Sequence, residues 1–168
     1  TYPAIHGPLE DASLADLRQT LERLVVFPFA LMKAAAPHLK RQGRGRVVMI
    51  TSCRTDLPLP GGHIPDIARA GENAFVRSLA LELAEFGVAV NGVAPNYLYS
   101  EAYFPRALYR DDPRGSEFIE RAVPAGRLGR PEEAGELVRH LCTMQGSFLT
   151  GAVIRLSGGW PAAPPRPF

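Results

Sequence analysis

The chain has 168 residues, of which 46% are hydrophobic and 21% are charged, a size and composition that fit one globular domain with its own core. The formal net charge is +2, and basic and acidic residues are interspersed, so the chain lacks the polycationic face that nucleic acid requires. Every apolar run is far shorter than the roughly 20 residues of a bilayer span, and the chain opens with no basic-then-apolar leader. We therefore expect a cytoplasmic protein that binds neither nucleic acid nor a membrane.

The first predicted helix covers Ser13–Lys40. Ser13 and the carboxylate three residues later have the spacing of a capping box, and leucines recur after them with the helical period. Pro28 lies inside this pattern without an N–H for the hydrogen-bond ladder, so we expect a bend or a break near Leu24. Gly43 is suited to the left-handed residue that follows a helix C-terminus.

The remaining pattern alternates strands with helices. Two further helices are predicted, and a third is expected to open at Pro131, where a proline is followed by two carboxylates. The first predicted strand is β-branched without alternation, as a strand covered on both faces would be. The predicted strands are Arg46–Thr51, Val88–Val93 and Ala152–Leu156, and the predicted helices between them are Ile67–Glu85 and Ser116–Ala122.

Strands that alternate with long helices indicate an α/β fold with a parallel sheet. Three strands are few for such a sheet, which suggests that strands are missing or that a partner chain covers an edge. The connection from Ala94 to about Arg114 is long enough to be a lid or a binding loop, whereas Leu57–His63 is rich in proline and glycine and is expected to be loop. Residues 160–168 form a Pro-rich tail.

Several blocks together resemble the C-terminal part of a short-chain dehydrogenase/reductase. The resemblance implies that residues 1–168 form a single, incomplete, Rossmann-like domain, the last part of a doubly wound parallel sheet. It also implies that a complete member carries the Gly-rich turn and the remaining strands before Thr1, and the chain begins without a Met, as if cut from something longer. The blocks that carry the resemblance are Gly45–Ser52, Ala68–Ala70, Val76–Ala84, Val88–Pro95, Gly126–Glu133, Leu149–Gly151 and Ser157–Gly159.

Within that family, reductases carry Tyr-x-x-x-Lys with a serine thirteen residues before the tyrosine. Counted from Ser52, the tyrosine position is Pro65 and the lysine position is Arg69, and the position of a further asparagine in the long helix is Leu24. Arginine in place of the lysine resembles the halohydrin dehalogenases, which share the fold but bind a halide where nicotinamide would lie. The resemblance therefore implies a protein without a nicotinamide cofactor.

The turn after the second strand strengthens this resemblance, because halohydrin dehalogenases can have Pro-Asn-Tyr-Leu where reductases have Pro-Gly. By resemblance, Ser52 positions the substrate oxygen and Arg69 lowers the pKa of a tyrosine base. Backbone N–H groups and aromatic edges stabilise the leaving halide. The residues expected to form this halide and substrate pocket are Pro95, Asn96, Tyr97, Leu98 and Phe104.

The pattern departs from the family at its centre, because Pro65 cannot act as a base. His63, two residues earlier, is a candidate substitute because histidine titrates near neutral pH. Ser52 is otherwise a turn or helix cap. The four histidines and two cysteines show no metal-ligand spacing, so we expect no metal site.

Two further alternatives concern charge and backbone. Arg69 either serves the site or is a relic that pairs with Asp66 or Glu72. Asn96 either shapes an anion pocket or takes the left-handed conformation that glycine takes in reductases.

The leading functional hypothesis is a halohydrin dehalogenase-like protein that interconverts vicinal haloalcohols with epoxides and halide ion, with activity impaired by Pro65. The first alternative is a non-catalytic homologue that serves as an oligomerisation or binding module. In resembling proteins, the counterparts of helices Ser13–Lys40 and Asp66–Phe86 pair into a four-helix interface, which implies a homodimer or homotetramer. The second alternative is an NAD(P)-dependent oxidoreductase, disfavoured by Arg69 and Asn96.

Overall fold

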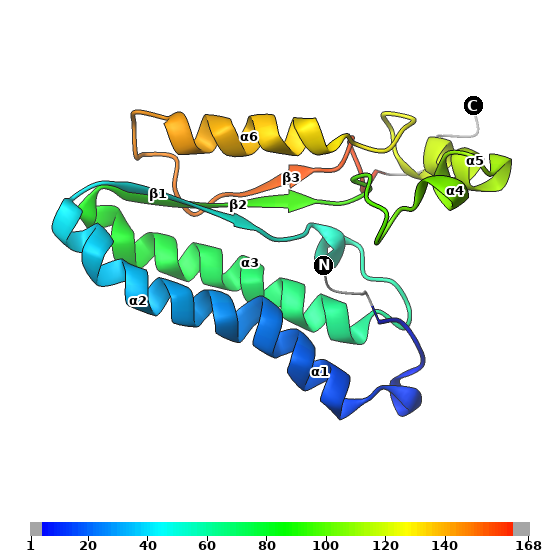
Figure 1. Ribbon diagram of the computed structural model, residues 1–168, viewed down its shortest axis with the longest axis horizontal. Helices are drawn as coiled ribbons and strands as arrows, with labels where there is room; N and C mark the ends of the chain where they lie inside the picture. The colour runs from blue at the N-terminus through cyan, green and yellow to red at the C-terminus, as the bar shows by residue number, and fades with distance from the viewer. Residues whose placement is uncertain (1–4, 163–168) are drawn as a thin grey trace.

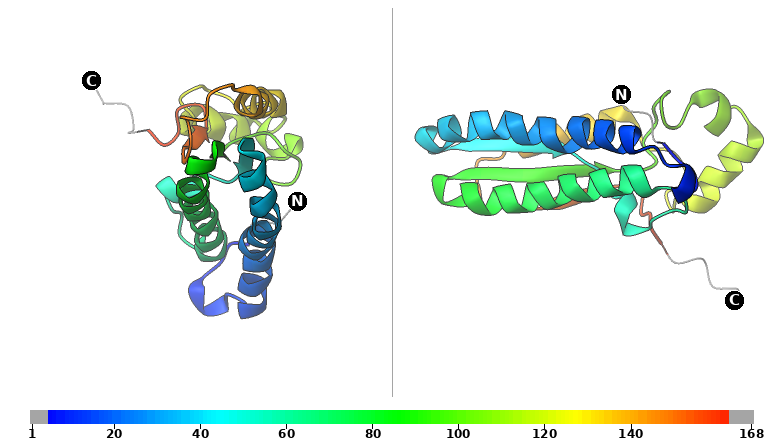
Figure 2. Two further views of the ribbon diagram at one scale, coloured as in Figure 1. Left: turned by 90° about the vertical axis from the view of Figure 1, so that its left-hand side faces the viewer. Right: turned by 90° about the horizontal axis from the view of Figure 1, so that it is seen from below.

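The computed structural model describes residues 5–162, in which three parallel strands lie between two layers of helices (Figure 1). Strand β1 (Gly45–Ile50) pairs with β2 (Val88–Pro95), and β2 pairs with β3 (Val153–Leu156). Helices α1, α2 and α3 lie on one face of the sheet and α6 lies on the other, as the two further views show (Figure 2). The predicted α/β fold with a parallel sheet is confirmed.

The first long helix forms where the capping pattern predicts it. Helix α1 (Leu14–Leu21) follows Ser13, whose hydroxyl accepts a hydrogen bond from the Asp16 N–H at 3.3 Å. The chain then passes through a π-helical segment, Glu22–Val26, before α2 (Phe27–Gln42).

A π-helical segment lies where a bend or a break was predicted near Leu24, and the helix continues through it without a break. Pro28 cannot donate to the Leu24 carbonyl and its ring would clash with that carbonyl, so the preceding turn widens while the helix continues. Helix α2 ends at Gly43, which takes the left-handed conformation with φ 67°.

Helix α3 (His63–Leu83) begins four residues before the predicted start at Ile67, and the prediction that His63 lies in a loop is wrong. Pro65 occupies the first turn of the helix, where a missing N–H removes no intrahelical hydrogen bond. The Gly-Gly-His-Ile-Pro stretch therefore leads directly into a helix, although its composition favours a loop.

The C-terminal part contains three helices. The long connection after β2 includes a short helix, α4 (Arg106–Tyr109), which the sequence did not predict, and α5 (Pro113–Ala122) starts before the predicted Ser116. Helix α6 (Pro131–Thr143) opens at Pro131 as expected. Of the predicted Pro-rich tail, residues 163–168 lie outside the described part of the chain.

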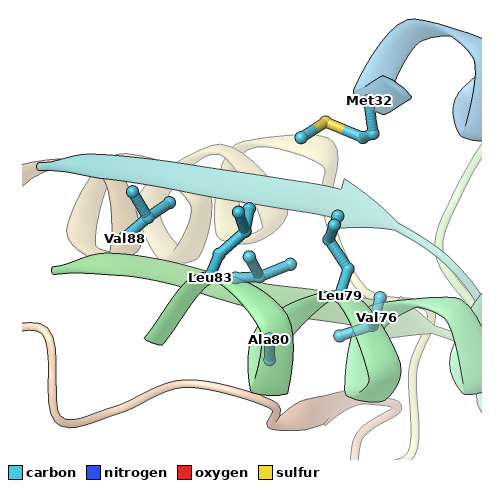
Figure 3. Close-up of a cluster of buried hydrophobic side chains, with 7 residues drawn as sticks. Met32, Val76, Leu79, Ala80, Leu83 and Val88 are labelled. Carbon is cyan, nitrogen blue, oxygen red and sulfur yellow. The ribbon is translucent and has the colours of Figure 1, made fainter. Parts of the chain in front are cut away.

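The main core lies between α2, α3 and the sheet. Leu83, Val76, Val88 and Val90 are fully buried, and Met32 reaches them from α2 (Figure 3). Strand β2 is buried along almost its whole length because it has a neighbour on each side. Strand β1 lies at the sheet edge. Its Val47 and Met49 pack against the core on one face and α6 contacts it on the other, so the strand is covered on both faces except at Ile50, which is 53% exposed.

One side chain joins the first strand to the end of α6. The Arg46 guanidinium donates hydrogen bonds to the carbonyl oxygens of Met144, Gln145 and Gly146 at 3.1, 2.8 and 3.1 Å. These are carbonyls at and beyond a helix C-terminus, which have no partner within the helix. Arg46 therefore fixes α6 over its face of the sheet.

Candidate functional site

The candidate site lies where the carboxyl ends of the parallel strands meet, beside α4 and α5 (Figure 1). Ser52 lies two residues after the end of β1 and is 8% exposed. Its hydroxyl donates to the Pro95 carbonyl at 3.1 Å and accepts from the Arg54 N–H at 3.2 Å. The structure therefore brings Ser52 and the turn after β2 together, with the Ser52 hydroxyl partly engaged by protein groups.

The turn that follows β2 is held at both ends. The Asn96 N–H donates to the Leu156 carbonyl at 3.2 Å, and the Asn96 side-chain oxygen accepts from the Tyr97 N–H at 3.0 Å. Tyr97 has φ 52° and is the residue other than glycine with a positive φ within residues 5–162. The alternative that Asn96 takes the left-handed conformation is therefore wrong, because its neighbour does.

Backbone in this conformation is costly for a residue with a side chain and is found where surrounding contacts enforce it. Here those contacts leave one donor unused. Among the described residues, the Leu98 N–H has no hydrogen-bond partner. The residues on either side of Leu98 are bonded to Gly129, whose N–H donates to the Tyr97 carbonyl and whose carbonyl accepts from the Tyr99 N–H.

Aromatic side chains surround this turn. The Tyr97 ring lies 5.3 Å from Phe104, 6.2 Å from Phe118 and 5.7 Å from Trp160, measured between ring centroids. Burial raises the pKa of Tyr97, and the nearby Tyr109 raises it further. Tyr97 is therefore a neutral, wall-forming side chain at neutral pH rather than a ready base. Of the five predicted pocket residues, Pro95 to Leu98 are consecutive in the turn and Phe104 packs against Tyr97, so the structure brings all five together.

Arg69 is held by its own helix. Its guanidinium donates to the Glu72 carboxylate at 2.8 Å, and Glu72 is 4% exposed. Burial raises the pKa of Glu72, and the Arg69 charge opposes that shift. In residues 5–162, no hydrogen bond joins Arg69 to Ser52 or to the turn, so of the predicted alternatives the structure contains the pair with Glu72.

Asp66, the other predicted partner, binds Arg54 instead. The Arg54 Nε lies 2.5 Å from an Asp66 carboxylate oxygen, and both side chains are largely buried. A Cβ on Gly62 would lie within 2.9 Å of both groups, so glycine is needed there to admit the pair. This ion pair ties the turn after Ser52 to the first turn of α3, and only the two opposite charges hint at it in the sequence.

His63 and Pro65 both lie in the first turn of α3. Pro65 is buried, whereas His63 lines a cavity of about 230 Å³ on the side of the N-terminal segment, together with His6, Asp11 and Asp16. Burial lowers the pKa of His6, and the Arg54 charge lowers it further. No hydrogen bond connects His63 to Ser52 in the described part of the chain, so the role of substitute base stays a prediction.

Sequence reasoning missed Asn73. This asparagine in the middle of α3 is 6% exposed, and its amide nitrogen donates to the Ser52 carbonyl at 2.9 Å. Its position four residues after Arg69, on the same helical face, was the available signal. Asparagine is usually exposed and disfavours helix interiors, so a buried one indicates a specific hydrogen bond.

Residues 5–162 contain neither a metal-ligand cluster nor a membrane-spanning helix. No three His, Cys, Asp or Glu side chains are grouped there as metal ligands. The helices in that range are also too short or too polar to span a bilayer.

Comparison with known proteins places the fold. Residues 1–161 match the family described as enoyl-(acyl carrier protein) reductase. A solved halohydrin dehalogenase, bound to ethyl (2S)-oxiran-2-ylacetate, is 32% identical with a TM-score of 0.93, covering 100% of this chain and 68% of its own. A solved dehalogenation enzyme is 35% identical with a TM-score of 0.89, covering 95% of this chain and 65% of its own.

The curated relatives carry other names. A tropinone reductase homologue of Arabidopsis thaliana is 36% identical over 159 residues, which cover 93% of this chain and 58% of the relative. The chain spans about three fifths of the length of the curated relatives it matches.

Proposed function

The chain belongs to the short-chain dehydrogenase/reductase family, and from that membership we propose that it is a halohydrin dehalogenase-like protein. In this proposal it interconverts vicinal haloalcohols with epoxides and halide ion, and it needs no nicotinamide for that reaction. Its activity is low because Pro65 stands where the family resemblance places the base.

The observation that carries the proposal is the turn from Pro95 to Leu98. Tyr97 takes a positive φ, and the Leu98 N–H has no protein partner within residues 5–162. A halide needs N–H groups and the positive edges of aromatic rings, and this turn offers an unpaired backbone donor in the residue after Tyr97, whose ring packs against Phe104, Phe118 and Trp160. The likeness to a solved halohydrin dehalogenase over the whole chain supports the same assignment.

The chemistry assigns a role to each group. Ser52 would orient the substrate hydroxyl, and the turn would stabilise the halide that leaves from the neighbouring carbon. A base must take the hydroxyl proton, and neither Pro65 nor the neutral Tyr97 is suited to that task. Arg69, balanced by Glu72, would support a tyrosinate at position 65 only in part, because its charge is shared.

A matched pair of variants tests the missing base. Pro65→Tyr adds a phenol beside Arg69, and Pro65→Phe adds the same ring without the hydroxyl. A positioned general base contributes about 10²- to 10⁴-fold, so Pro65→Tyr is expected to raise the rate by at least the lower figure. Chloride release from 1,3-dichloro-2-propanol, and azide opening of an epoxide, measure it.

The phenylalanine variant should stay at the parent rate. Equal rates for both variants and the parent would contradict the proposal, because the phenol would then have nothing to act on.

Halide binding can be measured without turnover. Trp160 is the chain's single tryptophan, is 7% exposed, and contacts the Tyr97 ring. Bromide bound at the turn should quench its fluorescence along a saturable curve, while sulfate at equal ionic strength should not. A linear bromide response would indicate collisional quenching and no site.

A second candidate, an NAD(P)-dependent oxidoreductase, is favoured by the names of the curated relatives. Titration with NADPH, followed by the fluorescence of the reduced cofactor, separates the two. Cofactor binding without halide binding would favour the oxidoreductase.

A third candidate, a non-catalytic oligomerisation module, is favoured by large apolar side chains that are more than half exposed on α2 and α3. Light scattering of the parent and of Phe27→Ser tests it. This candidate expects the parent to assemble and Phe27→Ser to dissociate, and it expects neither protein to release halide. These side chains are Phe27, Phe29, Leu31, Ile67 and Leu81.

A further inference from the structure

We propose that Asn73 is a positioning residue of this site, which holds Ser52 through the Ser52 main-chain carbonyl. The inference rests on the proposed function for its consequence in binding and catalysis, but the contact itself is independent of that function.

The contact links three parts of the fold. The Asn73 Nδ2 donates to the Ser52 carbonyl at 2.9 Å and lies 3.5 Å from the Thr55 hydroxyl, so it spans the turn that follows β1. On the other side, the Ser52 hydroxyl donates to the Pro95 carbonyl at 3.1 Å. Helix α3, Ser52 and the turn after β2 are therefore joined through two consecutive hydrogen bonds.

Asn73 and Arg69 are one helical turn apart, so they project from the same face of α3. Arg69 is occupied by Glu72, whereas Asn73 reaches the strand end directly. Of the two, Asn73 is the side chain through which α3 controls where Ser52 lies.

Packing alone does not account for asparagine here. Its Oδ1 is buried without a hydrogen-bond partner among the described residues, which is unfavourable. Asparagine is also a weak helix former, and leucine would fill a similar volume without either cost. The amide is explained by the donor that it supplies to Ser52.

Asn73→Asp and Asn73→Leu test the proposal, because they differ in what they can donate. An ionised carboxylate only accepts and would repel the Ser52 carbonyl, whereas a protonated carboxyl can donate again. Burial raises the pKa of a carboxyl group, so the protonated form is accessible at mildly acid pH. The aspartate variant should therefore behave like the parent at pH 5 and like the leucine variant at pH 8.

Cys53 provides a readout that needs no activity. It is 1% exposed and follows Ser52, and in a Cys142→Ser background it is the only thiol in the chain. The alkylation rate of Cys53 reports local opening of the turn. At each pH the rate of a variant is divided by the rate of the parent. Loss of a hydrogen bond worth roughly 1 kcal/mol predicts about fivefold faster labelling. That increase is expected for leucine at both pH values and for aspartate at pH 8 alone.

Bromide affinity from Trp160 fluorescence is the functional readout. The proposal expects weaker bromide binding in the same variants and at the same pH, and it expects a lower kcat when they are combined with Pro65→Tyr. An unchanged labelling ratio overturns the proposal whatever the bromide result. Faster labelling with unchanged bromide affinity and kcat also overturns it, because Asn73 would then be structural only.

If the parent binds no bromide, the proposed function fails, and labelling alone decides whether Asn73 holds Ser52. Asn73→Ser keeps a shorter donor and serves if the leucine variant does not fold. Its labelling ratio should lie between those of the parent and of the aspartate variant at pH 8, and a ratio equal to the parent's counts against the proposal.

Discussion

Arg69 and Glu72 form an ion pair at 2.8 Å within helix α3, and Glu72 is 4% exposed. The pair places a carboxylate where water cannot solvate it, so the ionised form is stabilised by one guanidinium alone. Burial outweighs that attraction and raises the pKa of Glu72.

Glu72→Gln should change how stability depends on pH. The folded protein binds the Glu72 proton more tightly than the unfolded chain does, so parent stability falls as pH rises from 4.5 through the raised pKa. The glutamine variant lacks this fall. Urea unfolding between pH 4 and pH 8 measures it, with Glu82→Gln as the exposed control; parallel profiles for parent and Glu72→Gln would contradict the assignment.

Glu133 should contribute to stability with the opposite pH dependence, so Glu133→Gln should cost stability at neutral pH and little at low pH. Hydrogen bonds from Arg127 and from the Arg130 N–H lower the pKa of Glu133 to about 2. Its stabilising contribution is therefore present above pH 4.5 and is lost as pH falls toward 2. Because the pair is exposed, added salt should weaken it.

Thermal unfolding at pH 7 and pH 3, with and without 0.5 M NaCl, tests this pair. Glu132→Gln, at the neighbouring position, is the control. If Glu133→Gln lowers stability as much at pH 3 as at pH 7, the charge of Glu133 is not responsible.

Leu83→Ala should unfold the protein more easily than Leu81→Ala. Leu83 is fully buried in the core below the sheet, and a buried leucine truncated to alanine costs about 2–5 kcal/mol. Leu81, on the same helix, is 83% exposed, so its truncation should stay within about 0.5 kcal/mol. Equal shifts in the urea midpoint would mean that α3 packs with another face.

Gly115→Ala should destabilise the folded protein, whereas Gly135→Ala should stabilise it. A Cβ on Gly115 would overlap the Leu108 carbonyl oxygen, so α4 and α5 would have to separate, at a cost of about 1–3 kcal/mol. Nothing lies within 4 Å of a Cβ on Gly135 in α6, where alanine should add about 0.5–1 kcal/mol. Thermal unfolding of both variants measures this, and destabilisation by both would exclude the packing argument.

The regular elements could be predicted because their signals are local. The capping pattern at Ser13, the proline at position 131 and the glycine at position 43 each act within one helical turn, and each prediction is confirmed. The start of α3 was missed because the stretch before it is rich in proline and glycine, a composition that favours a loop, although a proline in a first turn removes no hydrogen bond.

The site could be predicted only in part. The parallel order of β1 and β2 brings Ser52 to Pro95, and that followed from the alternation of strands and helices. The pairing of Arg54 with Asp66, and the contact of Asn73 with Ser52, depend on how α3 turns about its axis. Spacing along one element does not determine that rotation.

The Arg46 contacts with the chain after α6 have a consequence for the time course of folding. Arg46 and Gln145 are separated by 99 positions, which a ribosome working at about 5–20 residues per second covers in about 5–20 s. During that interval β1 has been synthesised but the segment that its arginine holds has not. The face of β1 that α6 covers is therefore open in the nascent chain during that interval, whereas α2, α3 and the paired strand β2 are all synthesised before it ends.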